Sequence, residues 1–228
     1  MTTRNKGKRL DGYVKDYVVF DLETTGINQE RDAIIEISAV MVRDGQAANY
    51  YSSLVNPHMH IPKAATAVNG ITDDMVKDSP DIGIAIGQFI EFAGSEILVG
   101  HNIHTFDTNF AYDAAWNFLG KELKNDYIDT LYMARSCLPQ LKHHRLTDIS
   151  EYFHIETAGA HRALNDCIMN YKCYEELGKL RTEKKLPYQT CSDLVCPLCK
   201  GSLMKRNGKF GIFYGCGNYP RCRYTRNL

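Results

Sequence analysis

The sequence predicts an α/β protein, a mixed sheet flanked by helices, followed by a small cysteine-rich module. Strand-like stretches come first, and helical and extended patterns then alternate, an order typical of a mixed sheet with helices packed on it. Five of the eight cysteines lie in the last 38 residues, starting at Cys191. The chain length of 228 residues is enough for one good hydrophobic core with a small appendage.

The strands expected first are antiparallel. The stretch YVVFDLETTG, residues 17–26, begins with four apolar residues and ends in a turn. The β-branched stretch AIIEISAVMV, residues 33–42, is followed by Asp44-Gly45, a strong hairpin signal, and then by ANYYSSLV, residues 48–55. These patterns predict two or three antiparallel strands.

Helices are expected in the second half of this region. Ser79-Pro80 is a helix start signal, and apolar residues recur at helical spacing over residues 79–94. EILVGHN, residues 96–102, predicts a short buried strand, and residues 106–120 predict a helix closed by Gly120. Two further helices are expected over residues 146–153 and 164–180.

The charges are unevenly distributed. The chain has 27 basic and 27 acidic residues, but seven of the basic ones and only one acid lie from Cys191 onward. An acidic body is suited to holding cations, and a basic tail is suited to polyanions. The sequence contains no run of about 18 or more apolar residues, so no membrane span is predicted. The basic N-terminus does not match a secretory signal. We therefore expect a cytoplasmic protein that does not contact membranes.

Four segments are expected along the chain. They are a basic N-terminal tail over residues 1–15, a main domain over 16–180, a polar linker over 181–193, and a four-cysteine unit over 194–228.

The stretch Tyr17–Gly26 places two carboxylates in an unusual position. Asp21 and Glu23 are two residues apart in a predicted strand, so their side chains point to the same face. Two buried carboxylates that lie side by side repel each other unless a cation compensates their charge. The pair therefore predicts a cation site.

Two later stretches supply further candidate ligands. In HNIHTFDTNF, Asp107 begins a helix directly after a buried strand, where the helix dipole favours a carboxylate. In HRALNDC, His161 precedes Asp166 by five residues near a helix start. Oxygen ligands of this kind suit Mg²⁺ or Mn²⁺.

The chain resembles the DEDDh 3′–5′ exonucleases, which include the epsilon and PolC-type exonucleases of bacterial replicases. The resemblance rests on three motifs taken together: FDLETTG, HN four residues before FD, and HRAL leading to an aspartate. The resemblance covers residues 16–180 and implies an RNase H-like fold. It implies that Asp21, Glu23, Asp107 and Asp166 hold two Mg²⁺ or Mn²⁺ ions and that His161 is the general base. Two such ions about 4 Å apart stabilise the attacking and departing oxygens of a phosphodiester, and a histidine takes the proton from the attacking water.

The contacts with the substrate are expected from the turn after the first strand. The backbone amides of Thr24, Thr25 and Gly26 are candidates to contact the terminal 3′ hydroxyl and nucleotide, and Asn102 and Phe106 are candidates to line the pocket. The alternative for all five is a plain turn or core packing. VNGIT, residues 68–72, differs from the family pattern in having Asn69 where a histidine is common.

The C-terminal cysteines predict a zinc site. CPLC and CGNYPRC give Cys196, Cys199, Cys216 and Cys222, two close pairs separated by a hairpin-length insert with Asn207-Gly208 as its turn. The stretch resembles the C-terminal zinc ribbons of bacterial type I topoisomerases, which implies one structural Zn²⁺ and binding of single-stranded DNA. Aromatic and basic residues alternate in this segment: Lys205, Arg206, Lys209, Phe210, Phe213, Tyr214, Tyr219, Arg221, Arg223 and Tyr224. The alternative is that the aromatic residues form the core of the ribbon.

The expected function is hydrolysis of single-stranded or frayed DNA from its 3′ end, with the ribbon holding the strand. An exoribonuclease of the same fold is one alternative. A nucleic-acid-binding protein accessory to a DNA polymerase is the other, and a polymerase is then a candidate partner.

Overall fold

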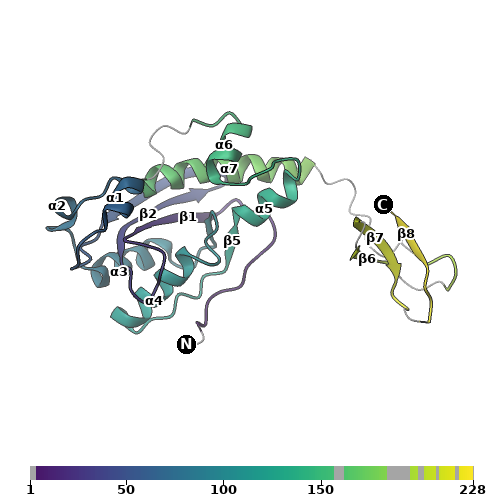
Figure 1. Ribbon diagram of the computed structural model, residues 1–228, viewed down its shortest axis with the longest axis horizontal. Coiled ribbons are helices and arrows are strands. Elements are labelled where there is room, and N and C mark those ends of the chain that lie inside the picture. Colours follow the sequence, from purple (N-terminus) through teal and green to yellow (C-terminus); the bar gives the residue numbers. More distant parts are fainter. Residues whose placement is uncertain are drawn as a thin grey trace. The chain divides into compact units, whose positions relative to one another are not determined.

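The computed structural model describes residues 4–156, 162–183, 196–199, 203–208, 211–218 and 221–227. The chain divides into two compact units, Met1–Arg181 and Thr182–Leu228 (Figure 1).

The larger unit is built on a five-stranded mixed sheet in the order β3-β2-β1-β4-β5. β1 is antiparallel to β2 and parallel to β4, so it lies at the centre of the sheet. The strands are β1 Tyr17–Thr24, β2 Ile34–Arg43, β3 Gln46–Leu54, β4 Leu98–Gly100 and β5 Tyr127–Asp129. The mixed sheet predicted from the order of elements is confirmed.

The hairpin predicted between the second and third strands is also present. Asp44 and Gly45 have φ values of 47° and 73°, and positive φ at both central residues is what a tight hairpin turn requires. β2 and β3 pair on either side of this turn, from Arg43 with Gln46 to Glu36 with Leu54, with one irregularity between Met41 and Val42.

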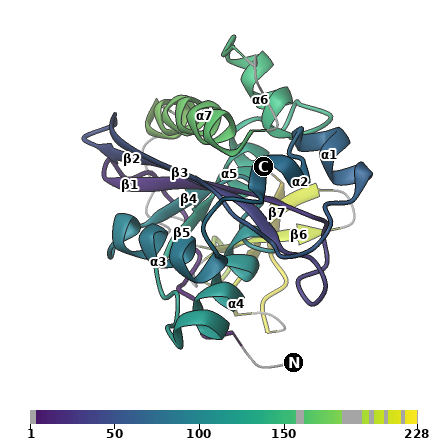
Figure 2. The same ribbon diagram turned by 90° about the vertical axis from the view of Figure 1, so that its left-hand side faces the viewer.

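Helices cover both faces of the sheet (Figure 2). One face packs on α3 (Ile82–Ala93) and α4 (Asp107–Leu119), and its core includes Val18, Phe20, Phe89 and Ala111. The other face packs on α5 (Thr130–Cys137), α6 (Leu146–Tyr152) and α7 (Ala163–Glu183), around Tyr17, Val19, Tyr174 and Leu177. β1 is therefore buried on both sides, which explains its unbroken apolar start.

Some elements carry too few residues to give a periodic signal in the sequence. These are β5, α5, and the two short helices α1 (Lys63–Asn69) and α2 (Asp73–Val76), which lie before α3. α1 and α2 cover a small separate cluster of apolar side chains: Ile35, Ile61, Ile71 and Val76. α7 continues to Glu183, three residues into the stretch where a linker is expected to start, because arginine and glutamate tolerate a helix well.

The basic N-terminal residues pack on the larger unit. Leu10, Tyr13 and Val14 pack against the core on the α7 face. The Tyr13 hydroxyl donates a hydrogen bond of 2.7 Å to Glu175 on α7. From residue 4 onward this stretch is thus part of the folded body.

The smaller unit contains a three-stranded antiparallel sheet in the order β6-β7-β8. Its strands are β6 Leu203–Gly208, β7 Gly211–Cys216 and β8 Thr225–Asn227. The hairpin is present, but Asn207 pairs with Ile212 and Gly208 with Gly211, so these two residues end the strand and do not form its turn.

Among the described residues, no helix combines the length and the apolar character needed to cross a bilayer.

Candidate active site

The position of Asp21 and Glu23 follows from the alternation of side chains along β1. Val18, Phe20 and Leu22 belong to the core beneath α3 and α4, whereas Tyr17 and Val19 belong to the core beneath α7. Asp21 and Glu23 continue the second row at the same two-residue period, so both stand on the α7 face. The side-by-side arrangement inferred from the sequence is therefore realised on a half-buried surface.

The neighbouring strand changes character at the same level. β2 pairs Val40 with Val19, Ser38 with Asp21 and Glu36 with Glu23. The sheet surface under α7 thus turns from apolar to polar on both strands at once. This change occurs where α7 begins, and the N-terminus of a helix favours negative charge.

Asp166 reaches the two β1 acids from the first turn of α7. One carboxylate oxygen from each of Asp21, Glu23 and Asp166 lies within 4.8 Å of the others, a spacing at which they could share a metal ion. The structure therefore brings together acids that are about 145 residues apart in the sequence.

Asp107 lies against this group from the other side. It is the first residue of α4 and is 4% exposed. β4 pairs with β1 only at Val18 and Val19, so the edge of β1 is open beyond that point. The carboxylate of Asp107 accepts a hydrogen bond of 3.2 Å from the Leu22 amide there. Asp107 is not one of the group of three within 4.8 Å, but it borders that group.

The proximity of these acids affects their protonation. Burial raises the pKa of Asp21 well above its ordinary value, and the charges of Asp107 and Asp166 raise it further. Burial also raises the pKa of Glu23, to about 7, although a hydrogen bond from Asn69 opposes the shift. For Asp107, burial outweighs the backbone hydrogen bonds and raises its pKa as well. A cation would relieve this cost.

The donor set fits a hard divalent cation. Every candidate ligand is a carboxylate oxygen, the ligand type that Mg²⁺ and Mn²⁺ prefer. The nearest arginine, Arg162, is already paired with Glu36, with Nη2 lying 3.0 Å from Oε1. The charge of Arg162 lowers the pKa of Glu23 only slightly.

Glu36 is a buried acid that sequence reasoning missed. It is 2% exposed and also accepts a hydrogen bond of 3.3 Å from the Ala163 amide, the first residue of α7. The pair with Arg162 ties the start of α7 to β2, directly beside Glu23. The available signal was a glutamate in the middle of the otherwise apolar strand of residues 33–42. His161, the predicted general base, lies outside the described residues.

The turn after β1 is closed by its own hydrogen bonds. The Thr25 amide donates to the Ala33 carbonyl at 2.9 Å, so it is engaged in this structure and not free for a substrate. The Thr24 hydroxyl donates to the Gly26 carbonyl at 2.6 Å. A Cβ at Gly26 would lie 2.4 Å from an Asp32 carboxylate oxygen, so any other residue there would require the Asp32 side chain to move. The turn is built tightly beside Glu23, and a substrate role for these three residues remains a prediction.

Asn102 and Phe106 lie in the loop between β4 and α4. Asn102 is exposed, with φ at 62°, and its amide donates to Asp129 at 3.0 Å. The amide of His104 donates to the same carboxylate at 3.0 Å. Phe106 is partly buried and packs on Phe110, with ring centroids 5.0 Å apart. The buried Asp129, another acid missed in the sequence, therefore fixes the loop that carries Asp107.

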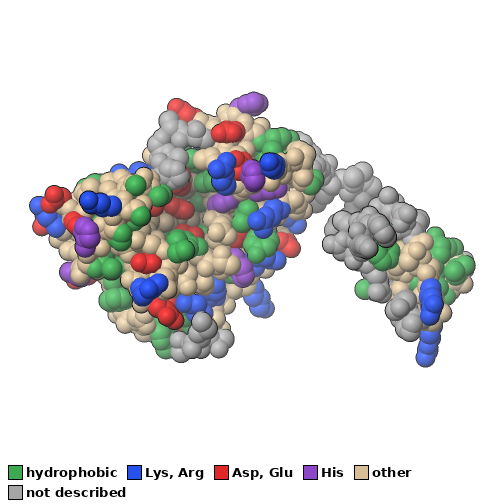
Figure 3. Space-filling model, viewed as in Figure 1, with side chains coloured by type: hydrophobic (Ala, Val, Ile, Leu, Met, Phe, Trp, Pro, Cys, Tyr) green, Lys and Arg blue, Asp and Glu red, His purple; other side chains and the backbone are tan. Residues whose placement is uncertain are grey.

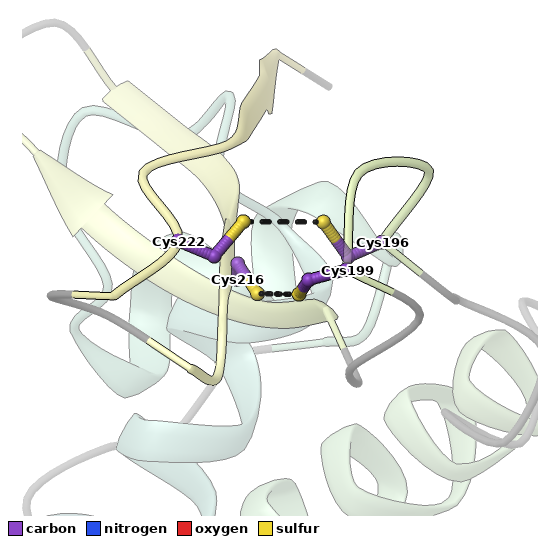
Figure 4. Close-up of side chains that lie close together, drawn as sticks. All are labelled: Cys196, Cys199, Cys216 and Cys222. Carbon is purple, nitrogen blue, oxygen red and sulfur yellow. Dashed lines mark hydrogen bonds between the residues drawn. The ribbon is translucent and has the colours of Figure 1, made fainter.

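The predicted zinc ligands converge in the smaller unit (Figure 4). The sulfur atoms of Cys196 and Cys222 are 3.6 Å apart, and those of Cys199 and Cys216 are 3.3 Å apart. One sulfur from each of the four lies within 4.8 Å of all the others. Tetrahedral zinc with Zn–S bonds of about 2.3 Å requires sulfur atoms at roughly this spacing. The four residues therefore fit one structural Zn²⁺.

Two aromatic residues of this unit have a packing role. Tyr214 and Tyr224 pack against the cluster formed by the buried cysteines and Leu203. They belong to the small core, as the alternative reading of the sequence expects. Phe210 and Tyr219, with Lys209, lie outside the described residues.

Comparison with known proteins agrees with this arrangement. A family model described as "Exonuclease" matches residues 18–174, and a model described as "Topoisomerase DNA binding C4 zinc finger" matches residues 193–228. Among solved structures, "Exonuclease X in complex with 5' overhanging duplex DNA" is 28% identical, with a TM-score of 0.57, covering 74% of this chain and 93% of that one.

Two curated relatives show how far the likeness extends. The DNA polymerase III PolC-type of Bacillus subtilis (strain 168) is 39% identical over 173 residues, 75% of this chain but only 12% of that protein. The DNA polymerase III subunit epsilon of Aquifex aeolicus (strain VF5) is 36% identical over 165 residues, 72% of this chain and 80% of that protein. The chain thus spans a small part of the PolC-type relatives.

Thermal stability should depend jointly on pH and Mg²⁺. The pKa of Glu23 is raised from 4.5 to about 7 in the folded protein. As the pH rises from 4.5 to about 7, Glu23 therefore loses its proton in the unfolded chain before it does so in the folded one. Metal-free protein should therefore lose stability as pH rises through this range. At pH 8, saturating Mg²⁺ should raise the Tm of the larger unit by about 5–10 °C, and at pH 5 by much less. Calorimetry measures both effects. An Asp21→Asn, Glu23→Gln variant that kept the full Mg²⁺ response would contradict the assignment.

The Glu36–Arg162 pair should contribute measurably to stability. Arg162→Met leaves a buried carboxylate without its cation and should cost about 1–3 kcal/mol in urea unfolding. Adding Glu36→Gln should recover part of this loss, because the uncompensated charge is removed as well. Lys15→Met, which breaks an exposed pair with Asp44, serves as the control and should change nothing measurable. If Arg162→Met and Lys15→Met lowered the free energy of unfolding by the same amount, Arg162 would act as an ordinary surface charge.

Proposed function

This chain belongs to the exonuclease family, and we propose from that premise that it removes nucleotides stepwise from the 3′ end of single-stranded or frayed DNA. The observation that carries the proposal is the convergence of Asp21, Glu23 and Asp166 at the end of β1, bordered by Asp107. Burying a group of mutually repelling acids costs free energy at neutral pH, and bound divalent cations would offset this cost.

The proposed role of the four acids is to hold two Mg²⁺ or Mn²⁺ ions. When bound, these ions would neutralise negative charge on the phosphate and on the attacking and leaving oxygens. Asp21 and Glu23 are fixed by the β1 ladder and Asp166 by the helix above it. The acids therefore need little rearrangement to receive the ions, which is the condition for effective electrostatic catalysis.

The proposed general base is His161, which would take the proton from the attacking water. It directly precedes Arg162, which is anchored to Glu36 by hydrogen bonds of 3.0 and 3.2 Å. The proposal also includes Thr24, Thr25, Gly26, Asn102 and Phe106 as contacts to the terminal nucleotide, with Thr25 acting through atoms other than its engaged amide.

The ribbon is proposed to bind single-stranded nucleic acid next to the strand being degraded. The name of its matching family model includes DNA binding, and its sequence is strongly basic. By analogy with the epsilon and PolC-type relatives, we further propose a role in DNA replication, a cytoplasmic location and a DNA polymerase as a partner.

Removing the catalytic groups should stop nucleotide release without unfolding the protein. His161→Ala should lower kcat about 10²–10⁴-fold, the usual contribution of a general base, and Asp166→Asn should lower it at least as far. A gel assay of 5′-labelled single-stranded DNA with Mg²⁺ measures the shortened products. Asp44→Asn, a change at an exposed acid, is the matched control and should retain full activity.

The same assay separates the alternatives. Degradation of a matched RNA faster than DNA would replace the proposal with the exoribonuclease alternative. Activity that survives in Asp166→Asn would refute the site. An inactive wild-type protein that forms a stable complex with a DNA polymerase would favour the accessory role.

Removal of the ribbon should weaken substrate capture and leave the chemistry intact. A chain ending at Glu183 keeps the whole of α7 and both cores of the larger unit. Its KM for long single-stranded DNA should rise at least about fivefold, since losing even one stacked base costs about 1–3 kcal/mol. Its kcat should be unchanged. A Cys199→Ser, Cys216→Ser variant of the full chain should behave in the same way, and unchanged KM values in both would remove the ribbon from substrate binding.

A further inference from the structure

The N-terminal arm, residues 4–10, extends the sheet at its β5 edge. The Tyr127 amide donates to the Lys8 carbonyl at 2.9 Å, and the Leu10 amide donates to the Tyr127 carbonyl at 2.7 Å. A Cβ at Gly7 would lie 2.0 Å from the Asn125 carbonyl oxygen, so the arm follows the edge as closely as a glycine allows. The arm is a fixed part of the body.

Two basic residues of the arm anchor it to α4. The guanidinium of Arg4 donates two hydrogen bonds to Asp113, at 2.7 and 2.6 Å. The ammonium of Lys6 donates to the His104 carbonyl and the Thr108 hydroxyl, both at 3.1 Å, and to the Asn109 side chain at 2.5 Å. Since Asp107 lies between these acceptors in sequence, Lys6 ties the arm to the loop that carries a candidate metal ligand.

The next two basic residues are not used in this way. Lys8 and Arg9 are exposed, and neither has a carboxylate within ion-pair distance in the described part of the chain. The Arg9 guanidinium lies 4.2 Å from the centroid of the Tyr132 ring on α5, and Arg135 lies 6.0 Å from the same ring. Arg9, Tyr132 and Arg135 therefore form a cationic and aromatic patch, here called the arm patch.

The arm patch borders the loop between β4 and α4, here called the active-site loop because it leads to Asp107. The His104 ring meets the edge of Tyr132 with centroids 6.2 Å apart, and it also stacks on Tyr127. His104 is three residues before Asp107, and its amide is held by Asp129. Lys and Arg side chains are visible over α5 on the face shown in Figure 3. A ligand bound at the arm patch would thus lie next to the loop that leads into the acidic centre.

We propose that the arm patch binds the sugar–phosphate backbone of the nucleic-acid strand whose 3′ end lies at the four acids. This inference rests on the proposed function for the position of the 3′ end. The body has an excess of acids, so a polyanion is repelled except where cations gather. Exposed arginine side chains beside a tyrosine are groups that bind phosphates and stack on bases without sequence preference. The family match begins at residue 18, so the arm lies outside it.

The test compares two variants with the same loss of charge. The arm variant, Arg9→Gln, Arg135→Gln, changes the arm patch, and the control Lys15→Gln, Lys179→Gln removes two exposed lysines that pair with surface acids. Binding of a fluorescein-labelled 20-nucleotide single-stranded DNA is measured by anisotropy without added divalent cation. The arm variant should bind about tenfold more weakly, and its slope of log K against log salt should be smaller by about 1.4, the value for two lost phosphate contacts. The control should bind as the wild type does.

A kinetic measurement distinguishes failure of this proposal from failure of the proposed function. If the chain degrades DNA, the arm variant should raise KM for the 20-mer several-fold and leave kcat unchanged, because the patch is proposed to bind the strand and not to take part in the chemistry. Binding and KM equal to those of the control would overturn the proposal. If the wild type has no nuclease activity, the anisotropy result alone still supports or overturns binding at the patch.

Discussion

The repulsion among carboxylates at the end of β1 is the constraint on which the larger unit depends. Asp21 and Glu23 continue the row of β1 side chains that faces α7. The two residues before them in this row, Tyr17 and Val19, are fully buried. Apolar side chains there would extend the core, so the acids cost stability that only cations or hydrogen-bond donors offset. The fold places such donors beside two of them: the side chain of Asn69 donates to Glu23, and the amide of Leu22 donates to Asp107.

A second set of charges fixes the elements that carry these acids. Glu36 and Arg162 join β2 to the start of α7, while Asp129 and Lys6 hold the loop before α4 from its two sides. Each of these groups is buried or partly buried, and each bonds to backbone atoms or to an opposite charge. The acids of the centre are therefore held in place by other ionic side chains, which is how a site with strong internal repulsion keeps one geometry.

The smaller unit solves a different problem. Three short strands bury too little apolar surface to fold stably on their own, and Leu203, Tyr214 and Tyr224 are the main apolar side chains packed with the cysteines. The Asn218 amide lowers the pKa of the Cys216 thiol, but burial and the neighbouring thiols outweigh it and raise this pKa, so the Cys216 thiol stays protonated without a metal. Zinc binding would supply both the thiolates and the stability.

The sequence by itself determined the ligand chemistry and most of the sheet. The row of Asp21 and Glu23 follows from strand periodicity, the turn at Asp44 and Gly45 from residue type, and the four-cysteine cluster from spacing, all local properties of the chain. Only the tertiary structure decided which distant groups meet. The docking of the arm on β5 and the pairing of Glu36 with Arg162 depend on long-range packing. The burial of Asp129 beneath the active-site loop also depends on it, because these contacts join segments that no local pattern relates.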